Sequence, residues 1–316
     1  MSLALLADIG GTHARFGLWD HKAAALIAFD RLHAANFDSF TDAVTAFLAA
    51  NGTPGLTGMA VAAAGPVVAG GIDLTNSHWQ LSRADLSAFA DHTVLMNDFA
   101  AIAMGLPALA PGDWTSFGPD LEGDLDGTLG VLGPGTGLGV AGLVQAGGGL
   151  SERLLTGEGG HVTLAARTPR EWALIEALLE RFPHVSVERL VSGPGFGLIY
   201  ETLSRIDGDP LTHLDDPADI ATRARAGEPR AKEAVELFAA FLGGAAGDLA
   251  LTLGATGGIY IAGGIVPRWG DLFPADLFRA RFEDKGRFTE WLARVPTRLI
   301  THERPAFLGL ARALHP

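Results

Sequence analysis

The stretch Leu3-Ala-Leu-Leu-Ala-Asp-Ile-Gly-Gly-Thr-His-Ala-Arg-Phe16 is the most informative part of this 316-residue sequence. An apolar run that carries one carboxylate, Asp8, ends at a Gly-Gly-Thr turn, and a second apolar segment follows it. This pattern predicts a buried strand that leads into a hairpin. The glycines allow a phosphate to approach the backbone N–H groups, Thr12 adds a hydroxyl, Asp8 can hold Mg²⁺ through its water shell, and Arg15 can neutralise developing charge. We therefore predict a phosphate-binding turn, with a plain glycine hairpin as the alternative.

Two blocks of the chain share this pattern of an apolar strand, a glycine-rich turn and a second strand. The first predicts the order βββαβαβα, with strands at 3–9, 14–19, 25–29, 59–64 and 93–96 and helices at 38–50, at 82–90 after a Ser82–Asp85 capping box, and through 104–107. The second predicts strands at 128–132, 140–144, 149–155, 259–262 and 298–301 and helices at 170–181, 187–191, 195–205, 229–253 and 305–314. We infer two α/β lobes related by an old duplication. Three glycines in the long helix, Gly243, Gly244 and Gly247, indicate that another element packs closely there.

Composition excludes several classes of site. The chain has no cysteine, which rules out disulfides, thiolate nucleophiles, iron–sulfur clusters and cysteine zinc sites. The formal charge is −13 and only three residues are lysine, so a nucleic-acid groove is not expected. The N-terminus lacks a basic n-region, so we expect no secretory signal. Uncharged windows at 54–72 and 249–267 are long enough to span a membrane. Glycine and proline interrupt both, so we interpret each as a buried strand plus a turn. We expect a cytoplasmic protein without a membrane partner.

A second glycine-rich turn, Gly133-Pro-Gly-Thr-Gly-Leu-Gly139, also lies between two predicted strands. It is not a Rossmann fingerprint, because position 138 is leucine and a strand follows rather than a helix. It is not a Walker A loop either, since no lysine follows a glycine. Two strand–turn–strand phosphate loops, one on each lobe, remain, and together they would clamp a polyphosphate.

Polar side chains at two further places are candidates for the chemistry. Asp98 ends a predicted strand and is the candidate general base, and Asn97 beside it can donate to and accept from a hydroxyl; helix capping is the alternative for this pair. Glu158 and His161 lie in a glycine-rich loop where their side chains can converge on a ligand. A zinc or iron site would want a third protein ligand, so hydroxyl binding is favoured. For Glu188, the dipole of a helix beginning at Ser186 is a sufficient explanation.

Seven segments together resemble the bacterial glucokinase family, hexokinases of the actin/Hsp70/sugar-kinase superfamily, in the branch without structural zinc cysteines. They follow one another along nearly the whole chain as Leu6–Phe16, Asn97–Phe99, Gly133–Gly139, Gly157–His161, His184–Gly195, Ile261–Arg268 and Phe282–Phe288. The resemblance implies a two-lobed actin-like ATPase (ribonuclease H-like) fold, with mixed sheets flanked by helices and a cleft between the lobes. The lobes would be 1–108 plus 303–316 and 109–302. It also implies ATP and Mg²⁺ as cofactors, glucose 6-phosphate as product, and a homodimer.

The resemblance also implies roles for individual residues. The sugar contacts would be Asn76, Asn97, Asp98, Glu158, His161 and Glu188, with Asp98 as base. The nucleotide contacts would be Asp8 (which would also hold Mg²⁺ through water), Gly10, Gly11, Thr12, Arg15, Gly135, Thr136, Gly137, Gly263, Gly264 and Ile265. His13 departs from the family, whose members usually have asparagine there. Trp79 is expected in the core, and the arginines from Arg279 to Arg287 on solvated helix faces. A kinase for mannose, fructose or an N-acetyl hexosamine is the first alternative. A sugar-sensing regulator is the second, although it would need a DNA-binding helix-turn-helix.

Overall fold

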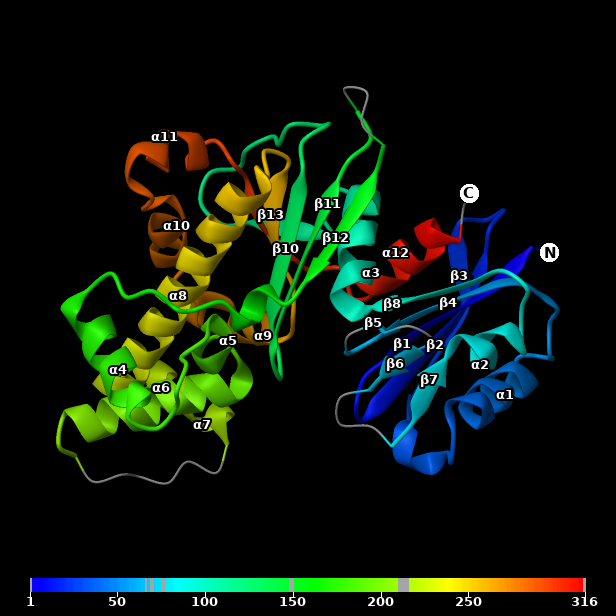
Figure 1. The fold of residues 1–316 in the computed structure, drawn as a ribbon, viewed down its shortest axis with the longest axis horizontal. Coiled ribbons are helices and arrows are strands. Elements are labelled where there is room, and N and C mark those ends of the chain that lie inside the picture. Colours follow the sequence, from blue (N-terminus) through cyan, green and yellow to red (C-terminus); the bar gives the residue numbers. More distant parts are fainter. Residues whose placement is uncertain are drawn as a thin grey trace. The chain divides into compact units, whose positions relative to one another are not determined.

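A computed structural model describes residues 2–65, 67–68, 71–74, 78–147, 151–209 and 216–314 (Figure 1). The chain divides into two compact units: unit 1 is Met1–Pro111 with His302–Pro316, and unit 2 is Gly112–Thr301. The division predicted from the sequence differs from this one by at most three residues at either boundary.

Unit 1 is built on a five-stranded sheet in the order β3-β2-β1-β4-β8. The strands are β1 (Leu3–Ile9), β2 (His13–Asp20), β3 (Ala25–His33), β4 (Leu56–Ala63) and β8 (Thr93–Asn97). β1 to β3 form an antiparallel meander, whereas β4 and β8 run parallel to β1. A second small sheet contains β5 (Val67–Val68), β6 (Gly71–Asp73) and β7 (Gln80–Ser82), none of which the sequence pattern predicted.

Helices cover both faces of the unit 1 sheet (Figure 1). On one side Phe16 of the sheet meets Phe40 and Phe47 of α1 in an aromatic cluster. Trp79 is 2% exposed, which confirms it as a core residue, and the predicted capping box of Ser82 and Asp85 is present. The helical segments of unit 1 are η1 (Ala34–Asn36), α1 (Phe40–Ala50), α2 (Arg83–Ser87), α3 (Asp98–Gly105), η2 (Leu106–Ala108) and α12 (Pro305–Ala313).

The sheet of unit 2 repeats the plan of unit 1 and adds one strand. Its order is β12-β11-β10-β13-β14-β9, again three antiparallel strands followed by two that run parallel to the central one. Its strands are β9 (Trp114–Ser116), β10 (Leu129–Pro134), β11 (Leu138–Val144), β12 (Arg153–Gly157), β13 (Gly258–Ile261) and β14 (Thr297–Ile300). The shared order and directions agree with the duplication inferred from the sequence, whereas the sequence pattern did not reveal β9.

The helices of unit 2 pack around α8, which runs beside the sheet (Figure 1). By length and composition α8 could cross a membrane, but 67% of its most apolar window is buried, so packing against α6, α7 and α10 accounts for its apolarity. The helical segments of unit 2 are η3 (Gly159–His161), α4 (Pro169–Leu179), α5 (Val187–Leu190), α6 (Gly193–Ile206), α7 (Pro217–Arg225), α8 (Pro229–Leu253), α9 (Ile265–Trp269), η4 (Gly270–Leu272), α10 (Ala275–Glu283), η5 (Gly286–Phe288) and α11 (Thr289–Leu292).

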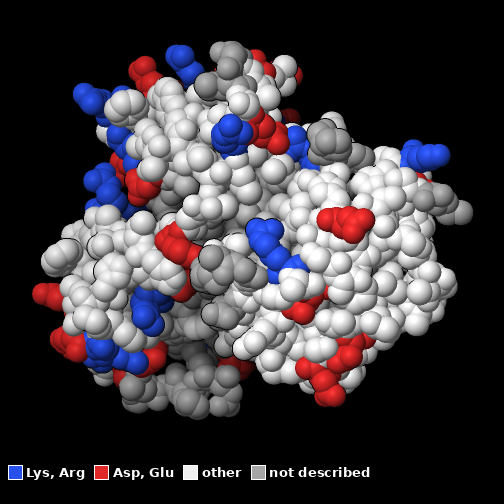
Figure 2. Space-filling model, turned by 45° about the vertical axis from the view of Figure 1, so that its right-hand side comes forward, with Lys and Arg blue, Asp and Glu red and all other residues white. Residues whose placement is uncertain are grey.

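One prediction about charged residues is wrong. Arg279 of α10 does not lie on a solvated helix face; it is 5% exposed. Its guanidinium donates to the carbonyls of Leu292, Ala293 and Val295 and pairs with Glu283 at 2.5 Å. A guanidinium has five N–H donors, so it can be buried wherever enough acceptors converge on it. On the face drawn in Figure 2, other basic side chains lie among acidic ones without forming a continuous basic surface.

Candidate functional site

In unit 1 the predicted catalytic residues meet at one edge of the sheet. The parallel strands β1, β4 and β8 are in register through Ile9, Ala63 and Asn97, so their carboxyl ends coincide. Asp8 lies one residue before this edge, and Asp98 begins α3 directly after it. Ligands of open α/β sheets bind at the carboxyl ends of the strands. The edge therefore brings two carboxylates together.

Asp8 and Arg15 face each other across the β1–β2 hairpin. Arg15 Nη1 lies 2.7 Å from Asp8 Oδ2. Burial raises the pKa of Asp8, and the neighbouring Arg15 opposes that rise. The turn between the strands, Gly10 to Thr12, is closed by a hydrogen bond from Gly10 N to His13 O, and Thr12 is exposed. The sequence placed Asp8 and Arg15 beside the same turn but did not reveal that they form an ion pair.

Asn97 and Asp98 play different parts at the start of α3. Asn97 Oδ1 accepts from the N–H groups of Phe99 and Ala100, and its Nδ2 donates to Gly65 O. Asn97 is thus the helix cap that was the alternative reading for this pair, and its side-chain amide also donates to the Asp98 carboxylate. Burial raises the pKa of Asp98, and the nearby Asp8 carboxylate raises it further. An aspartate with a raised pKa is better suited than an ordinary one to accept a proton near neutral pH.

In unit 2, three predicted sugar contacts gather beside the sheet. Glu158 directly follows β12, and His161 is the last residue of η3, which packs against β11. Glu188 lies in the first turn of α5. His161 Nε2 and Glu188 Oε1 are 3.9 Å apart. Glu158 and His161 are exposed, whereas Glu188 is half-buried. The structure thus brings together carboxylate and imidazole groups that can bind hydroxyls.

Glu188 also holds the second phosphate turn. Its Oε2 accepts a hydrogen bond of 2.8 Å from the backbone N–H of Leu138. A Cβ on Gly137 would lie 2.5 Å from the same oxygen, so glycine is required for the carboxylate to approach. On the other side of the turn, Gly193 N donates to Gly135 O at 2.8 Å. The helix dipole considered for Glu188 is therefore an incomplete explanation, because its carboxylate is bonded to a turn 50 residues away in the sequence.

A cavity of about 710 Å³ in unit 2 brings together two separate predicted nucleotide segments. Gly135 and Thr136 line it from the β10–β11 turn, and Gly264 and Ile265 line it from the start of α9. Gly263 lies between β13 and this pair, against the carbonyl of Pro134. The volume lies within the range of roughly 300–1,000 Å³ usual for small-molecule sites. This cavity can accommodate a ligand in contact with both glycine segments.

Several residues that line this cavity were not predicted. Arg225 of α7 donates to the carbonyl of Trp269 at 2.9 Å, and Arg268 lies against Gly264. No carboxylate among the described residues pairs with Arg268. Arg268 ends the segment Ile261–Arg268, which carries part of the family resemblance, so the sequence offered a signal for it. Arg225 lies on a helix that the sequence pattern did not predict. The walls also include Phe196, Asp216, Ala221, Thr222 and Trp269.

Two predicted positions need separate comment. Asn76 lies outside the described residues. His13, the departure from the family pattern, stacks edge-on against His33 and lies 3.2 Å from Arg31 Nη2 through its Nδ1. Partial desolvation and the nearby Arg31 lower the pKa of His13, which favours the neutral imidazole beside the phosphate turn.

The residue predicted to hold Mg²⁺, Asp8, offers carboxylate oxygens. No cluster of three or more histidine, aspartate or glutamate residues that could hold a metal occurs in the described part of the chain. Mg²⁺ does not need such a cage, since it commonly binds through one or two carboxylates plus substrate phosphates and water. Asp8 beside a phosphate turn, close enough to Asp98 to raise the pKa of that carboxyl, fits that donor set.

Comparison with known proteins places the chain in a family. The family model described as glucokinase matches residues 5–316. A glucokinase from Aromatoleum aromaticum is 45% identical, over 98% of this chain and 94% of its own. The crystal structure of a glucokinase from an Antarctic psychrotroph superposes with a TM-score of 0.90 at 35% identity, covering 100% of this chain and 99% of that one.

A more distant structure shares the fold. It is a ROK family glucokinase from Streptomyces griseus in complex with glucose and AMPPNP, with a TM-score of 0.65 at 20% identity over 99% of each chain. The two α/β units thus have the actin-like ATPase fold that these sugar kinases share. With a family match over nearly its whole length and a relative at 45% identity, the chain belongs to the glucokinase family.

Proposed function

We propose that this chain transfers the γ-phosphoryl group of ATP to the terminal hydroxymethyl oxygen of D-glucose, with Asp98 as general base. Phosphorylation of glucose by ATP follows from membership of the family. In the reaction the sugar oxygen attacks the γ-phosphorus, its proton passes to the carboxylate of Asp98, and the bond to the β-phosphate oxygen of ADP breaks. The observation that carries the base assignment is the position of Asp98 at the carboxyl edge of the sheet, where burial and Asp8 raise its pKa.

The nucleotide would be held by both glycine turns. Its phosphates would accept hydrogen bonds from the backbone of Gly10, Gly11 and Thr12 and from that of Gly135, Thr136 and Gly137, as backbone nests do elsewhere. Asp8 would hold Mg²⁺ through water, and the metal when bound spreads the phosphate charge. Arg15, already paired with Asp8, lies at the same turn and can offset the charge that develops on the transferred group. The adenosine would lie in the 710 Å³ cavity, beside Gly263, Gly264 and Ile265.

The sugar would be recognised by polar side chains from both units. Asn97 would contact the sugar beside Asp98, to which its side chain is hydrogen-bonded, while Glu158 and Glu188 accept from sugar hydroxyls. His161, exposed beside Glu188, can either donate or accept. Asn76 is a further proposed contact. Groups that bind hydroxyls reject sugars that lack them, because an unmatched polar group is left without a partner.

The cellular setting is proposed on the resemblance together with the composition. We expect a cytoplasmic enzyme that feeds glycolysis, uses Mg²⁺, and forms a homodimer. A cysteine-free chain is compatible with a reducing compartment. Light scattering on the purified protein measures the oligomeric state directly.

A coupled assay for ADP tests the proposed reaction. Glucose, mannose, fructose and N-acetylglucosamine are compared at equal concentration with Mg–ATP, and ADP and polyphosphate are tried as donors. We expect the highest kcat/KM with glucose and ATP. A higher kcat/KM for another hexose would replace the proposed substrate, and a gel shift with DNA fragments that showed specific binding would favour the regulator instead.

A further inference from the structure

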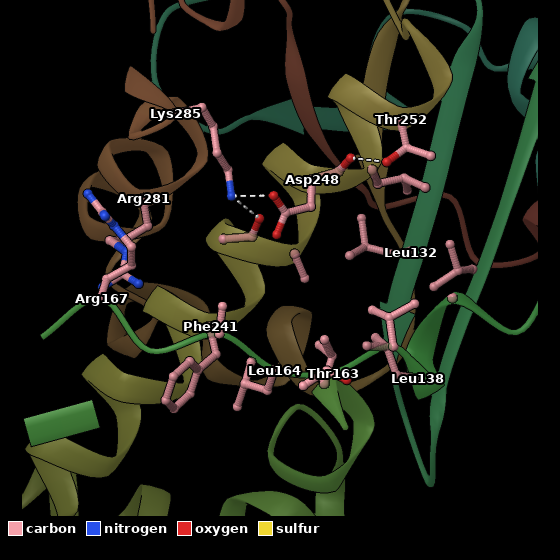
Figure 3. Close-up of a pocket in the computed structure, with 18 of the residues that line it drawn as sticks. Leu132, Leu138, Thr163, Leu164, Arg167, Phe241, Asp248, Thr252, Arg281 and Lys285 are labelled. Atoms are coloured by element: carbon pink, nitrogen blue, oxygen red, sulfur yellow. Dashed lines mark hydrogen bonds and ion pairs between the residues drawn. The ribbon is translucent and has the colours of Figure 1, made fainter. Parts of the chain in front are cut away.

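Unit 2 contains a second cavity, which the proposed reaction does not use. Its volume is about 270 Å³, and it lies between β10, β11, the segment 162–167 and α8, close to the end of α10 (Figure 3). None of the residues assigned above to sugar or nucleotide lines it. An apolar cavity of about 150 Å³ is enough to bind benzene, so this one has room for a substituted ring.

The cavity is apolar on one side and polar on the other. Leu132 and Leu138 project from the sheet, and Leu164 and Phe241 close the opposite wall (Figure 3). The polar side holds three cations, each of which has its own carboxylate partner. The ion pairs are Arg167 with Asp284, Arg281 with Glu171, and Lys285 with Asp248. Because these charges cancel, the cavity favours an uncharged molecule over an ion.

One of the three glycines of α8 lines the cavity. In α8, a Cβ on Gly243 would meet the carbonyl oxygen of Phe278 at 2.2 Å, and one on Gly247 that of Phe282 at 2.4 Å, which confirms that another element packs closely at both positions. The same expectation is wrong for Gly244, where an added Cβ meets nothing within 4 Å and the residue instead lines the cavity. Glycine destabilises a helix interior relative to alanine. No contact within the described part of the chain therefore requires glycine at position 244, which leaves its surface free to meet a ligand.

Lys285 supplies a directed polar group at the same place. Its Nζ donates to Gly244 O at 3.0 Å and to Asp248 Oδ1 at 2.6 Å (Figure 3). An ammonium has three N–H donors, and within the described chain the structure shows acceptors for two of them. The third can donate to a ligand whose apolar body rests on the leucines.

We propose that this cavity is a binding site for a small uncharged molecule with an apolar ring or branched aliphatic body and one hydrogen-bond acceptor. Three of its wall residues adjoin proposed substrate contacts: Leu138 follows Gly137, Gly159 follows Glu158, and Val187 precedes Glu188. A ligand that shifts these walls acts on the phosphate turn through Leu138 and on the sugar contacts through Gly159 and Val187. The site is therefore placed to alter the KM values of the reaction, and this regulatory consequence, unlike the binding itself, rests on the proposed function.

Acetophenone is a suitable probe, because it joins a ring to a single carbonyl acceptor. Its isostere α-methylstyrene has a methylene in place of that oxygen. Calorimetric titration of the full chain without substrates should show saturable binding of acetophenone and at least tenfold weaker binding of α-methylstyrene. Nuclear Overhauser effects should connect the acetophenone ring to the Phe241 ring and to the methyl groups of Leu138 and Leu164.

Variants locate the binding and separate it from catalysis. Gly244→Leu projects a side chain into the cavity and should weaken the binding of acetophenone at least tenfold. Gly55→Leu is the matched control, since a Cβ there also meets open space but lies in unit 1, and it should bind normally. If Gly244→Leu does not fold, Ala245→Met fills the same cavity. Unchanged binding in a folded filling variant, contacts to other methyl groups, or no saturable binding would each overturn the site. Binding without any change in the KM for glucose or ATP would overturn only the coupling.

Discussion

The carboxylate of Glu188 accepts a hydrogen bond from the backbone N–H of Leu138, so the residue beside His161 also braces the glycine turn from Gly135 to Gly137. A group proposed to bind sugar is thereby attached to a turn proposed to bind phosphate. Sugar binding at Glu188 and nucleotide binding at the turn should therefore affect each other.

Replacing Glu188 with alanine should weaken the binding of both substrates, glucose and ATP. The N–H of Leu138 loses its acceptor, which costs about 1–3 kcal/mol when a buried donor is left unpaired, or roughly 5- to 150-fold in affinity. We expect the KM for ATP to rise together with the KM for glucose in steady-state kinetics. Glu158→Gln serves as the control. Because Glu158 is exposed, this variant should raise only the KM for glucose. An unchanged KM for ATP in Glu188→Ala would refute the bracing role.

Replacing Asp98 with asparagine should remove the base and keep the binding site. General-base catalysis contributes about 10²–10⁴-fold, so kcat should fall by that factor. Glucose binding, followed by calorimetry, should remain measurable. Asp85→Asn, which changes a capping aspartate of the same unit, is the control and should leave kcat unchanged. Retention of more than about a tenth of kcat in Asp98→Asn would contradict the base assignment.

The pKa of Asp98 sets a direction for pH dependence. Because burial and Asp8 raise the pKa of Asp98, the base should lose activity on the acid side at a higher pH than an ordinary aspartate would. A raised carboxyl pKa in the folded state means that the folded protein holds the proton more tightly, so this contribution to stability is lost as pH rises through the raised pKa. Asp98→Asn should therefore raise Tm at neutral pH, and the gain should disappear in acid. Thermal melts of both proteins from pH 3 to pH 8 measure this.

Arg268 should contribute to nucleotide binding. It lines the 710 Å³ cavity beside Gly264, and a charge-assisted hydrogen bond to phosphate is worth about 1.5–3 kcal/mol. Arg268→Gln should therefore raise the KM for ATP at least tenfold and leave the KM for glucose unchanged. The matched variant Arg205→Gln, at an arginine paired with Glu180 in the same unit, should alter neither KM. Equal effects of the two variants on ATP would exclude the assignment.

Arg279 should be critical for folding and have no part in substrate binding. Arg279→Met leaves the carbonyls of Leu292 and Val295 without their donor and Glu283 without its partner. Breaking a buried charged network typically costs about 3–5 kcal/mol, which urea unfolding would detect as a lower midpoint. Arg287→Met is the control at an arginine that meets only the Phe288 ring in the described structure, and it should have little effect. A loss below 1 kcal/mol in Arg279→Met would show that other donors replace the guanidinium.

Much of the candidate site could be predicted because its signals are local in the chain. Strands with clear apolar patterns end at or beside Asp8, Asn97 and Asp98. Parallel strands bring such ends to one edge of the sheet. The helix 229–253 was predicted with both of its ends correct, since proline starts it and glycine ends it. The strands β5, β6, β7 and β9 have only two or three residues each, too few for a periodicity to appear.

The sequence by itself determined the family, the longer strands and helices that frame the two sheets, and the two glycine turns, because each depends on residues that are neighbours in the chain. Only the tertiary structure decided that Glu188 reaches Leu138, that Arg279 is buried, and that Gly244 faces a cavity while Gly243 faces α10. These facts depend on which atoms of distant segments come within a few ångströms of one another. Residue type and spacing do not specify that, because the same glycine in a helix can serve a close contact or leave an open space.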